Sequence, residues 1–285
     1  MINRNSCFLI VGLGLIGGSY ARALHKKGYR VLAITKYQSS IDYAKNEGFI
    51  DDGSTIVDEN LIKQADVIIF SLYPSLEVEW LRNYQHLFKP GTLLSDVAGV
   101  KGGIIDEIQS FLRADVEMIA CHPMAGKEVY GVENSDDAIF RDANFIVVPT
   151  EKNTREAIDD AYHLGEILGF NKVSQLTIKQ HDEIIGFVSQ LTHVIAVSLM
   201  TCNEDENLQN YTGDSFRDLT RIARINENMW SELFIDNKGP LIEQIDAFMN
   251  QMSCLRSMIE NEDVDELKKV FIKSTKRRAL FDKRK

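Results

Sequence analysis

Cysteine is scarce in this sequence, with four residues in a chain of 285. Cys7, Cys121, Cys202 and Cys254 are far apart and form no Cys-x-x-Cys pair, so neither a zinc knuckle nor a dithiol redox motif is indicated. Isolated cysteines of this kind are typical of reduced, buried thiols in a cytoplasmic protein. We therefore expect no metal site and a cytoplasmic location.

A long apolar run near the N-terminus is also missing. The longest run there, residues 7–18, is rich in glycine and much shorter than the roughly 20 residues that span a bilayer. No basic leader precedes it and no cleavage site follows it. We expect neither a signal peptide nor a membrane partner.

Positive charge is in deficit, because the sequence has 32 basic and 42 acidic residues and a formal net charge of -10. Such a chain has no general attraction for nucleic acid phosphates, although a local basic pocket can still bind an anion. The hydrophobic content of 44% excludes a disordered chain. At about 150 residues per domain, the length indicates two domains.

The first half of the chain alternates short apolar runs with segments of helical spacing. The runs predict strands at residues 7–11, 31–34, 67–70, 92–95, 118–120 and 145–148. The segments between them predict helices at residues 15–27, 39–46, 76–88 and 101–112. This alternation indicates a parallel sheet covered by helices, as in an α/β domain.

The second half has helical periodicity alone. Helices are predicted at residues 177–200, 216–225, 229–235, 241–259 and 264–279. We therefore predict a Rossmann-type nucleotide-binding domain at residues 1–170 and an all-α domain at residues 171–285. The first of these helices is apolar on more than one side, which fits either a homodimer interface or a helix inside a monomeric bundle.

A glycine motif joins the first predicted strand to the first predicted helix. It has the pattern Gly-x-Gly-x-x-Gly and consists of Gly12, Leu13, Gly14, Leu15, Ile16 and Gly17. In this context the first glycine allows a tight turn, the second lets the backbone approach a pyrophosphate, and the third lets the helix pack closely on the strand. The helix N-terminus then presents free N–H groups to the anion. The motif predicts a dinucleotide cofactor.

The carboxylate expected about 20 residues after the first strand of such a site is missing. Asp or Glu normally stands there and binds the ribose 2′-hydroxyl. Here Thr35 and Lys36 follow the second predicted strand. A hydroxyl and an ammonium group can bind a 2′-phosphate that a carboxylate would repel, so we favour NADP over NAD and leave NAD open.

One of the six histidines is a candidate base. His122 follows the predicted strand 118–120, and the carboxyl ends of strands are where open α/β sheets bind ligands. Transfer of a hydride to a nicotinamide requires a group that accepts the hydroxyl proton, and a neutral imidazole suits this role near pH 7. His25, His86 and His163 are instead predicted on outer helices.

Five segments together resemble the prephenate and arogenate dehydrogenases of tyrosine biosynthesis. They are GLGLIGGS at residues 12–19, DVAGVK at 96–101, HPMAG at 122–126, SQLTH at 189–193 and FRDLTRIA at 216–223. The resemblance implies a Rossmann domain followed by a helical domain that forms a dimer, with the active site between the two domains. It also implies oxidative decarboxylation of prephenate to 4-hydroxyphenylpyruvate, or of arogenate to tyrosine, with NAD or NADP.

The same resemblance implies roles for three residues. His122 matches the catalytic histidine that holds the ring hydroxyl of the substrate, His193 matches a histidine that contacts the substrate, and Arg221 matches the arginine that binds a substrate carboxylate. The planar donors of a guanidinium group suit the last role, because they pair with both carboxylate oxygens. Arg217, Arg221 and Arg224 are spaced to share roughly one face of a predicted helix.

One position departs from the family pattern. The usual motif is Asp-x-x-Ser-Val-Lys, and Gly99 stands at the position of the serine, while Asp96 and Lys101 are retained. Either another hydroxyl, such as that of Ser95, or water replaces the serine hydroxyl, or the geometry of the site differs.

Two other functions stay open at this level. The first is another two-domain reductase that acts on a β-hydroxyacid or an imine, although such enzymes usually rely on a lysine or another group of the helical domain rather than on two histidines. The second is a nucleotide-binding regulatory protein that has lost catalysis, which Gly99 slightly favours.

Overall fold

A computed structural model of the chain describes residues 2–281. Residues 282–285, the end of the predicted second domain, lie outside the described part. The chain forms two compact units, Met1–Asn237 and Lys238–Lys285, which are described separately. The predicted domain division after residue 170 falls inside the first unit and stays a prediction.

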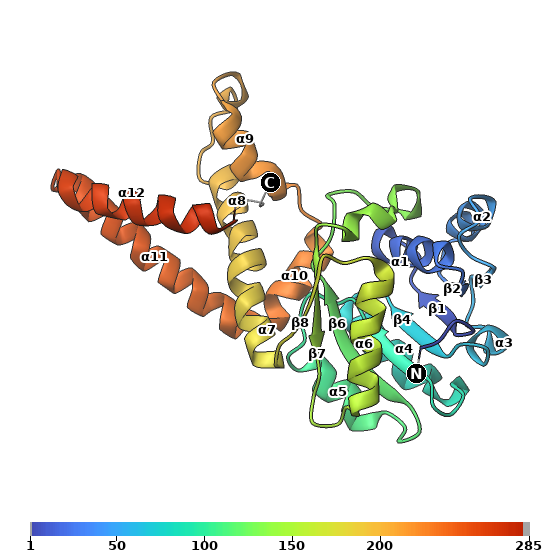
Figure 1. Cartoon of the computed structure of the whole chain (residues 1–285). Coiled ribbons are helices and arrows are strands. Elements are labelled where there is room, and N and C mark those ends of the chain that lie inside the picture. The colour runs from blue at the N-terminus through green and yellow to red at the C-terminus, as the bar shows by residue number, and fades with distance from the viewer. Residues whose placement is uncertain (1, 282–285) are drawn as a thin grey trace. The chain divides into compact units, whose positions relative to one another are not determined.

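The first unit is built on an eight-stranded sheet with the order β3-β2-β1-β4-β5-β6-β7-β8 (Figure 1). The strands are β1 Cys7–Val11, β2 Arg30–Ile34, β3 Asp52–Ser54, β4 Val67–Phe70, β5 Leu93–Asp96, β6 Glu117–Pro123, β7 Asn144–Val148 and β8 Lys172–Gln175. The first six strands have the order 3-2-1-4-5-6 of a dinucleotide-binding fold, in which ligands bind where the order reverses, beside β1.

The sheet is parallel, as predicted, except at one pair. β6 and β7 are antiparallel, with Cys121 opposite Val147. A parallel return usually needs a crossover helix, whereas the segment between these strands contains only two 3₁₀ turns, Val132–Asn134 and Asp137–Phe140. The prediction of a parallel sheet is therefore wrong at this pair.

Helices cover both faces of the sheet. They are α1 Leu15–Lys26, α2 Gln38–Asn46, α3 Glu59–Ile62, α4 Pro74–Tyr84, α5 Ile104–Phe111 and α6 Arg155–Leu168. One buried cluster joins α1 and α6 to the sheet face that carries Phe8 and Ile10, and a second joins α4 and α5 to the face that carries Leu9 and Val11. Because both faces are buried, these strands are apolar throughout.

Some short elements are not predicted by the sequence pattern. β3 and β8 are the edge strands of the sheet and have the polar sequences DGS and KVSQ, and α3 has four residues. Such elements contain too few apolar residues to show a period. Their conformation depends on the neighbouring elements against which they pair or pack.

The helix predicted at residues 177–200 forms one helical run that contains an interruption. α7, Ile178–Ile185, begins with a capping box formed by Thr177 and Gln180. A π-helical turn, Gly186–Leu191, follows, and α8, Thr192–Thr201, continues the run. Turns of this kind often lie at functional sites.

This run, Ile178–Thr201, is the one stretch of the described residues that is long and apolar enough to cross a membrane, with a mean hydropathy of 1.7. The core helix of a soluble protein meets the same criterion. The run buries His181, Asp182 and Gln190, and all three make hydrogen bonds to other elements of the first unit. Only 28% of the apolar window is buried within the described residues, so most of this run is not covered by its own chain, and the absence of a membrane partner stays a prediction.

The predicted helix that carries three arginines is shorter than expected. α9, Asp214–Thr220, passes into a 3₁₀ turn, Arg221–Ala223, and Arg224 is extended. The tighter 3₁₀ turn rotates the chain differently from an α-helix, so the three arginines do not share one helical face. The Arg217 guanidinium instead donates to Asp214.

The first unit ends with α10, Glu227–Asp236. The second unit consists of α11, Lys238–Glu260, and α12, Val264–Arg278, which pack against each other and are followed by a 3₁₀ turn, Ala279–Phe281. Asp263 caps α12 by accepting a hydrogen bond from the backbone of Glu266. The helical prediction for this part of the chain is confirmed.

All four cysteines are free thiols. Cys7 and Cys121 are buried, but Cys202 and Cys254 are exposed, so the prediction of buried thiols is wrong for these two. Both exposed thiols lie outside the α/β core, one at the end of α8 and the other in α11. The cytoplasmic location stays a prediction.

Candidate active site

The glycine motif forms the loop between β1 and α1, and its three glycines have different surroundings. Gly12 has a φ of 98°, and a Cβ on it would lie 2.2 Å from the carbonyl oxygen of Ser71. A Cβ on Gly17 would lie 2.0 Å from the carbonyl oxygen of Gly12, so α1 packs directly on the loop. A Cβ on Gly14 would meet nothing within 4 Å. The open space at Gly14, where α1 begins, fits a pyrophosphate.

Thr35 and Lys36 follow the carboxyl end of β2, next to this loop. Thr35 is buried, and its backbone N–H donates to the carbonyl of Ser54. Lys36 is exposed, with its ammonium group 4.9 Å from the centre of the Tyr37 ring. The two residues therefore occupy the positions after β2 at which a dinucleotide-binding fold normally carries a carboxylate.

A cavity of about 540 Å³ extends from the glycine loop to the helices that follow the sheet. Residues from six segments line it, among them Gly14, Ser71, Gly99, His122, His193 and Trp230. The predicted base and the predicted substrate-contacting histidine thus share a cavity with the loop that would hold the dinucleotide. The described residues of the first unit supply the whole lining.

His122 lies within β6, because this strand extends to Pro123 rather than ending at residue 120 as predicted. Its Nδ1 is 2.9 Å from Nε2 of His181 in α7. The Nδ1 of His181 is in turn 2.7 Å from Oδ1 of Asp182. These contacts form a chain of two imidazoles and one carboxylate that runs from the cavity into the interior.

Burial controls the protonation of both imidazoles. It lowers the pKa of His122 well below the ordinary value of histidine, and His181 adds to this shift. Burial also lowers the pKa of His181, although the hydrogen bond to Asp182 opposes the shift. Both histidines are therefore neutral near pH 7, as a general base must be. The adjacent Cys121 is not a nucleophile at this pH, because burial raises its pKa to about 12.

The retained residues of the family motif hold the segment before His122. Lys101 and Asp96 form a fully buried ion pair. The Lys101 ammonium also donates to the carbonyl of Cys121 over 2.7 Å, and the backbone N–H of Cys121 donates to Asp96 over 2.9 Å. The peptide groups on both sides of Cys121 are thereby clamped, which restricts the position of the next residue, His122.

His193 is the second residue of α8, which directly follows the π-helical turn. Its Nδ1 donates to the carbonyl of Ser189 over 2.9 Å, and its ring packs against Trp230 with the ring centres 3.6 Å apart and the ring planes tilted by 31°. Burial lowers its pKa. The π-helical turn brings Ser189 and Gln190 to the cavity lining beside this ring.

Arg221, the predicted carboxylate-binding residue, does not line the cavity. Its guanidinium group is exposed and forms an ion pair with Glu128, which does line it. Arg224 lines the cavity directly. Arg221 is thus connected to the rim of the cavity through Glu128.

Gly99 lines the cavity, as expected for the position of the family serine. A Cβ on Gly99 would lie 3.6 Å from Leu233, an ordinary van der Waals distance. Ser95, the predicted substitute, is fully buried and outside the lining. The serines that line the cavity are Ser71 and Ser189.

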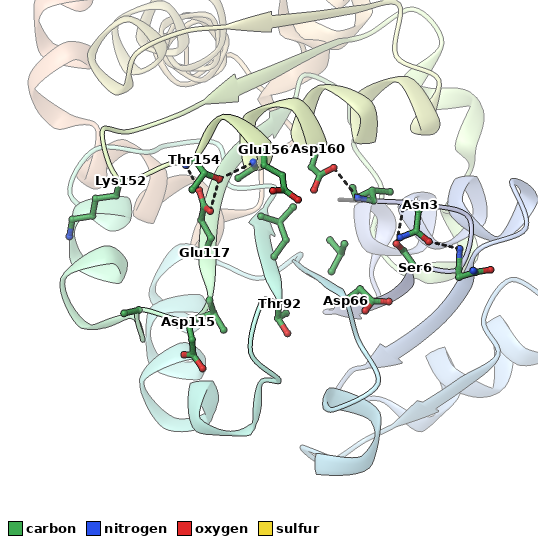
Figure 2. A pocket seen from close by; sticks show the side chains of 18 residues that line it. Asn3, Ser6, Asp66, Thr92, Asp115, Glu117, Lys152, Thr154, Glu156 and Asp160 are labelled. Atoms are coloured by element: carbon green, nitrogen blue, oxygen red, sulfur yellow. Dashed lines mark hydrogen bonds between the residues drawn. The ribbon is translucent and has the colours of Figure 1, made fainter.

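A second cavity, of about 830 Å³, lies at the opposite end of the strands (Figure 2). It contains several carboxylates, but they have partners: Glu117 accepts from Thr154, Asp160 accepts from the backbone of Ile2, and Asp66 pairs with Lys89. Open α/β sheets bind ligands at the carboxyl ends of their strands, so the cavity beside His122 is the better candidate.

His181 and Asp182 were not assigned a role from the sequence. His181 is 59 positions from His122, and a histidine next to an aspartate on a predicted amphipathic helix has no distinctive signal. Only the packing of α7 against the end of β6 shows the connection.

Two family models match the chain. The nucleotide-binding domain of prephenate dehydrogenase matches residues 20–172, and the dimerization domain of prephenate dehydrogenase matches residues 177–273. The first match begins just after the glycine motif, which the fold itself places at the start of the dinucleotide-binding sheet.

Individual relatives agree with the family models. The prephenate dehydrogenase of Bacillus subtilis is 28% identical over 92% of this chain and 72% of its own length. The cyclohexadienyl dehydrogenase of Zymomonas mobilis is 26% identical over 95% of this chain and 94% of its own length. A crystal structure of prephenate dehydrogenase from A. aeolicus, in complex with hydroxyphenyl propionate and NAD+, has a TM-score of 0.90 at 27% identity and covers 97% of this chain and 98% of that chain. The resemblance seen in the sequence motifs is confirmed, and the chain belongs to the prephenate dehydrogenase family of oxidoreductases.

Proposed function

We propose that the chain converts prephenate to 4-hydroxyphenylpyruvate and that His122 accepts the proton of the ring hydroxyl. The position of His122 is the observation that carries this proposal. Its neutral imidazole lines a cavity that also contains Gly14 of the glycine loop and His193 of α8. Such a cavity can hold a nicotinamide on one side of the reacting carbon and a base on the other.

The reaction balances with one base that takes a proton and returns it. The O–H bond of the ring hydroxyl breaks and its proton moves to Nε2 of His122, while the hydride of the same carbon leaves. The bound dinucleotide supplies the acceptor for that hydride. The bond to the ring carboxylate then breaks, carbon dioxide leaves, and the released electron pair makes the ring aromatic. The ring oxygen takes the proton back from His122, so no net proton is released.

Substrate binding requires positive charge in an otherwise acidic protein. Prephenate has two carboxylates, and we assign one of them to Arg221, whose guanidinium offers planar paired donors. Arg224, which lines the cavity, is close enough to the site to contribute. Replacement of Arg221 by alanine is expected to raise KM for the substrate with little change in kcat, and Arg224→Ala is the matched comparison that shows which guanidinium is used.

The cofactor proposed is NADP rather than NAD. Thr35 can donate a hydrogen bond to a 2′-phosphate, and the exposed Lys36 can neutralise its charge. NAD is bound by the A. aeolicus relative, so the choice between the two cofactors depends on these two side chains.

Arogenate is the second candidate substrate, and the tautomer of His193 favours it. Because Nδ1 of His193 donates to the Ser189 carbonyl, Nε2 of the neutral ring carries a lone pair. This lone pair can accept a hydrogen bond from the ammonium group of arogenate. Prephenate has a keto oxygen in place of the ammonium group, and a keto oxygen is itself an acceptor, so it cannot donate to Nε2. A matching relative is named a cyclohexadienyl dehydrogenase.

One assay tests these proposals together. Purified protein is mixed with prephenate or arogenate and with NAD+ or NADP+, and the absorbance of the reduced nicotinamide is followed. We expect turnover of prephenate with NADP+, and absence of turnover in all four combinations would overturn the proposal. His122→Asn is expected to lower kcat by about 10²–10⁴-fold and to leave Kd of the dinucleotide unchanged.

A further inference from the structure

We propose that His181 and Asp182 are positioning residues that hold His122 in the tautomer whose Nε2 can accept a proton. The proposal rests on the proposed role of His122 as the base. His181 has no exposed surface, and its side chain contacts the base on one side and Asp182 on the other. Among residues 2–281, His181 is the residue that is hydrogen-bonded to the His122 ring.

Asp182 determines the tautomer of His181, and His181 in turn determines the tautomer of His122. The carboxylate of Asp182 can only accept, so Nδ1 of the neutral His181 must donate to it. The Nε2 of His181 then carries a lone pair and accepts from Nδ1 of His122. With its proton on Nδ1, His122 has its lone pair on Nε2, the nitrogen that is free to face the substrate. In the opposite tautomer, Nε2 would carry the proton and His122 would not be a base.

Asp182 is itself held from several sides. Its Oδ1 accepts from the backbone N–H of Lys101 over 3.1 Å, and its Oδ2 accepts from that of Gly102 over 2.7 Å. Its backbone carbonyl accepts from the side chain of Asn237 over 3.0 Å. The carboxylate therefore cannot rotate away from His181 without losing two further hydrogen bonds.

The loop that contains Lys101 contacts both Asp182 and the segment before His122. The backbone N–H of Lys101 holds Asp182, while the side chain of Lys101 holds the carbonyl of Cys121, directly before His122. The loop thus sets the separation between α7 and the end of β6. This explains why the Asp-x-x-x-Val-Lys residues are retained although neither Asp96 nor Lys101 lines the cavity.

The proton balance of the reaction indicates that His181 positions His122 and does not carry a proton to solvent. His122 takes the hydroxyl proton and returns it to the same oxygen, so a proton path through His181 to solvent is not needed. While His122 holds the proton, His181 remains the acceptor for its Nδ1, and Asp182 holds His181 in place. A related arrangement, in which a carboxylate fixes the tautomer of a catalytic histidine, is worth up to about 10⁴-fold in kcat.

Two variants of His181 separate its possible roles. His181→Leu removes the acceptor for His122, and we expect kcat to fall by about 10²-fold or more, with KM and Kd of the dinucleotide unchanged. In His181→Gln, an amide oxygen can accept from Nδ1 of His122 while the NH₂ group donates to Asp182, so we expect most of the kcat to be recovered. Ile178→Ala, which loosens the packing of the same helix without removing these hydrogen bonds, is the control and should keep kcat.

A second measurement does not depend on turnover. In ¹⁵N-histidine-labelled protein at neutral pH, the His122 signals, identified by their loss in His122→Asn, should show protonation at Nδ1. The same pattern is expected in His181→Gln, and a mixture of tautomers in His181→Leu. Unchanged tautomers in His181→Leu, or loss of kcat in Ile178→Ala equal to that in His181→Leu, would overturn the proposal. If the wild type turns over none of the substrates, the proposed function fails, while the spectra still decide the role of His181.

Discussion

The neutral state of His122 follows from its surroundings rather than from its residue type. Its imidazole is enclosed at the end of β6, beside a second neutral imidazole and near the buried Lys101 ammonium, and all three features disfavour a positive charge. The type and position of the residue were predictable, since His122 follows an apolar run that reads as a strand. The presence of His181 behind it was not, because the two are far apart in the chain.

The activity should have an unusual tolerance of acid. A base must be deprotonated, so kcat/KM is constant above the pKa of His122 in the free enzyme and falls as the pH drops below it. Burial lowers this pKa, so we expect the fall to begin well below pH 6.5, the ordinary value for histidine. The profile of kcat/KM against pH measures it directly, and a fall centred at or above the ordinary value would contradict the assignment.

Gly99 offers a second test at the level of one side chain. Gly99→Ser should fold normally, because its Cβ would be in ordinary contact with Leu233. Its hydroxyl can then bind the substrate, and we expect kcat/KM to rise by about 2–10-fold, the value of one hydrogen bond. Gly99→Ala adds the Cβ without the hydroxyl and should leave kcat/KM unchanged. An equal effect of both substitutions would show that shape, and not the hydroxyl, matters.

At the scale of elements, the β1–α1 junction makes different demands on two of its glycines. Gly17→Ala would force a Cβ against a backbone oxygen, and we expect it to destabilise the fold by about 1–3 kcal/mol or more. Gly14→Ala has open space around its Cβ, so the Tm should be unchanged, while Kd of the dinucleotide rises because the methyl group occupies the pyrophosphate position. Thermal unfolding and fluorescence titration measure the two effects. A normal Kd in Gly14→Ala would mean that the pyrophosphate binds elsewhere.

The end of β2 should decide the choice of cofactor. Thr35→Asp introduces a carboxylate that binds a ribose 2′-hydroxyl and repels a 2′-phosphate. We expect the ratio of kcat/KM for NADP+ to that for NAD+ to fall by at least about tenfold, equivalent to one charge-assisted hydrogen bond. Thr35→Asn has the same shape without the charge and should change the ratio less. An unaltered ratio in the aspartate variant would refute the role of Thr35.

Several elements could not be predicted because their conformation depends on distant partners. β3 and β8 are polar edge strands, and each pairs with a single neighbouring strand, β2 or β7. The π-helical turn has no signal in the spacing of apolar residues, yet it brings Ser189 and Gln190 to the cavity. The turn after α9 likewise breaks the predicted arginine face.

At the scale of the whole molecule, α11 indicates how copies of the chain associate. Exposed apolar side chains recur along it at Ile242, Met249, Met252 and Ile259, at steps of three or seven residues. Such spacing places them on one side of the helix. Because the matched dimerization domain includes this helix, we expect the chain to form a homodimer in which this side is covered.

The double substitution Met249→Asp and Met252→Asp should separate the dimer, because it places two charges in an apolar interface. Light scattering after gel filtration should give about twice the chain mass of 32.3 kDa for the wild type and the chain mass for the variant. Asn250→Asp, on the opposite side of the helix, adds a similar charge and should stay dimeric. A monomeric wild type, or a dimeric double variant, would exclude this interface.

The sequence alone determined the features that depend only on short stretches of the chain. The glycine loop, the alternation of strands and helices, the position of His122 at a strand end and the family motifs depend on neighbouring residues, whose periodicity and spacing are visible directly. Tertiary structure alone decided which distant groups meet: His122 with His181 over 59 positions, Arg221 with Glu128 over 93, and the antiparallel pairing of β6 with β7. The physical reason is that local spacing reports the face on which a side chain lies, whereas a hydrogen bond between elements depends on how those elements pack.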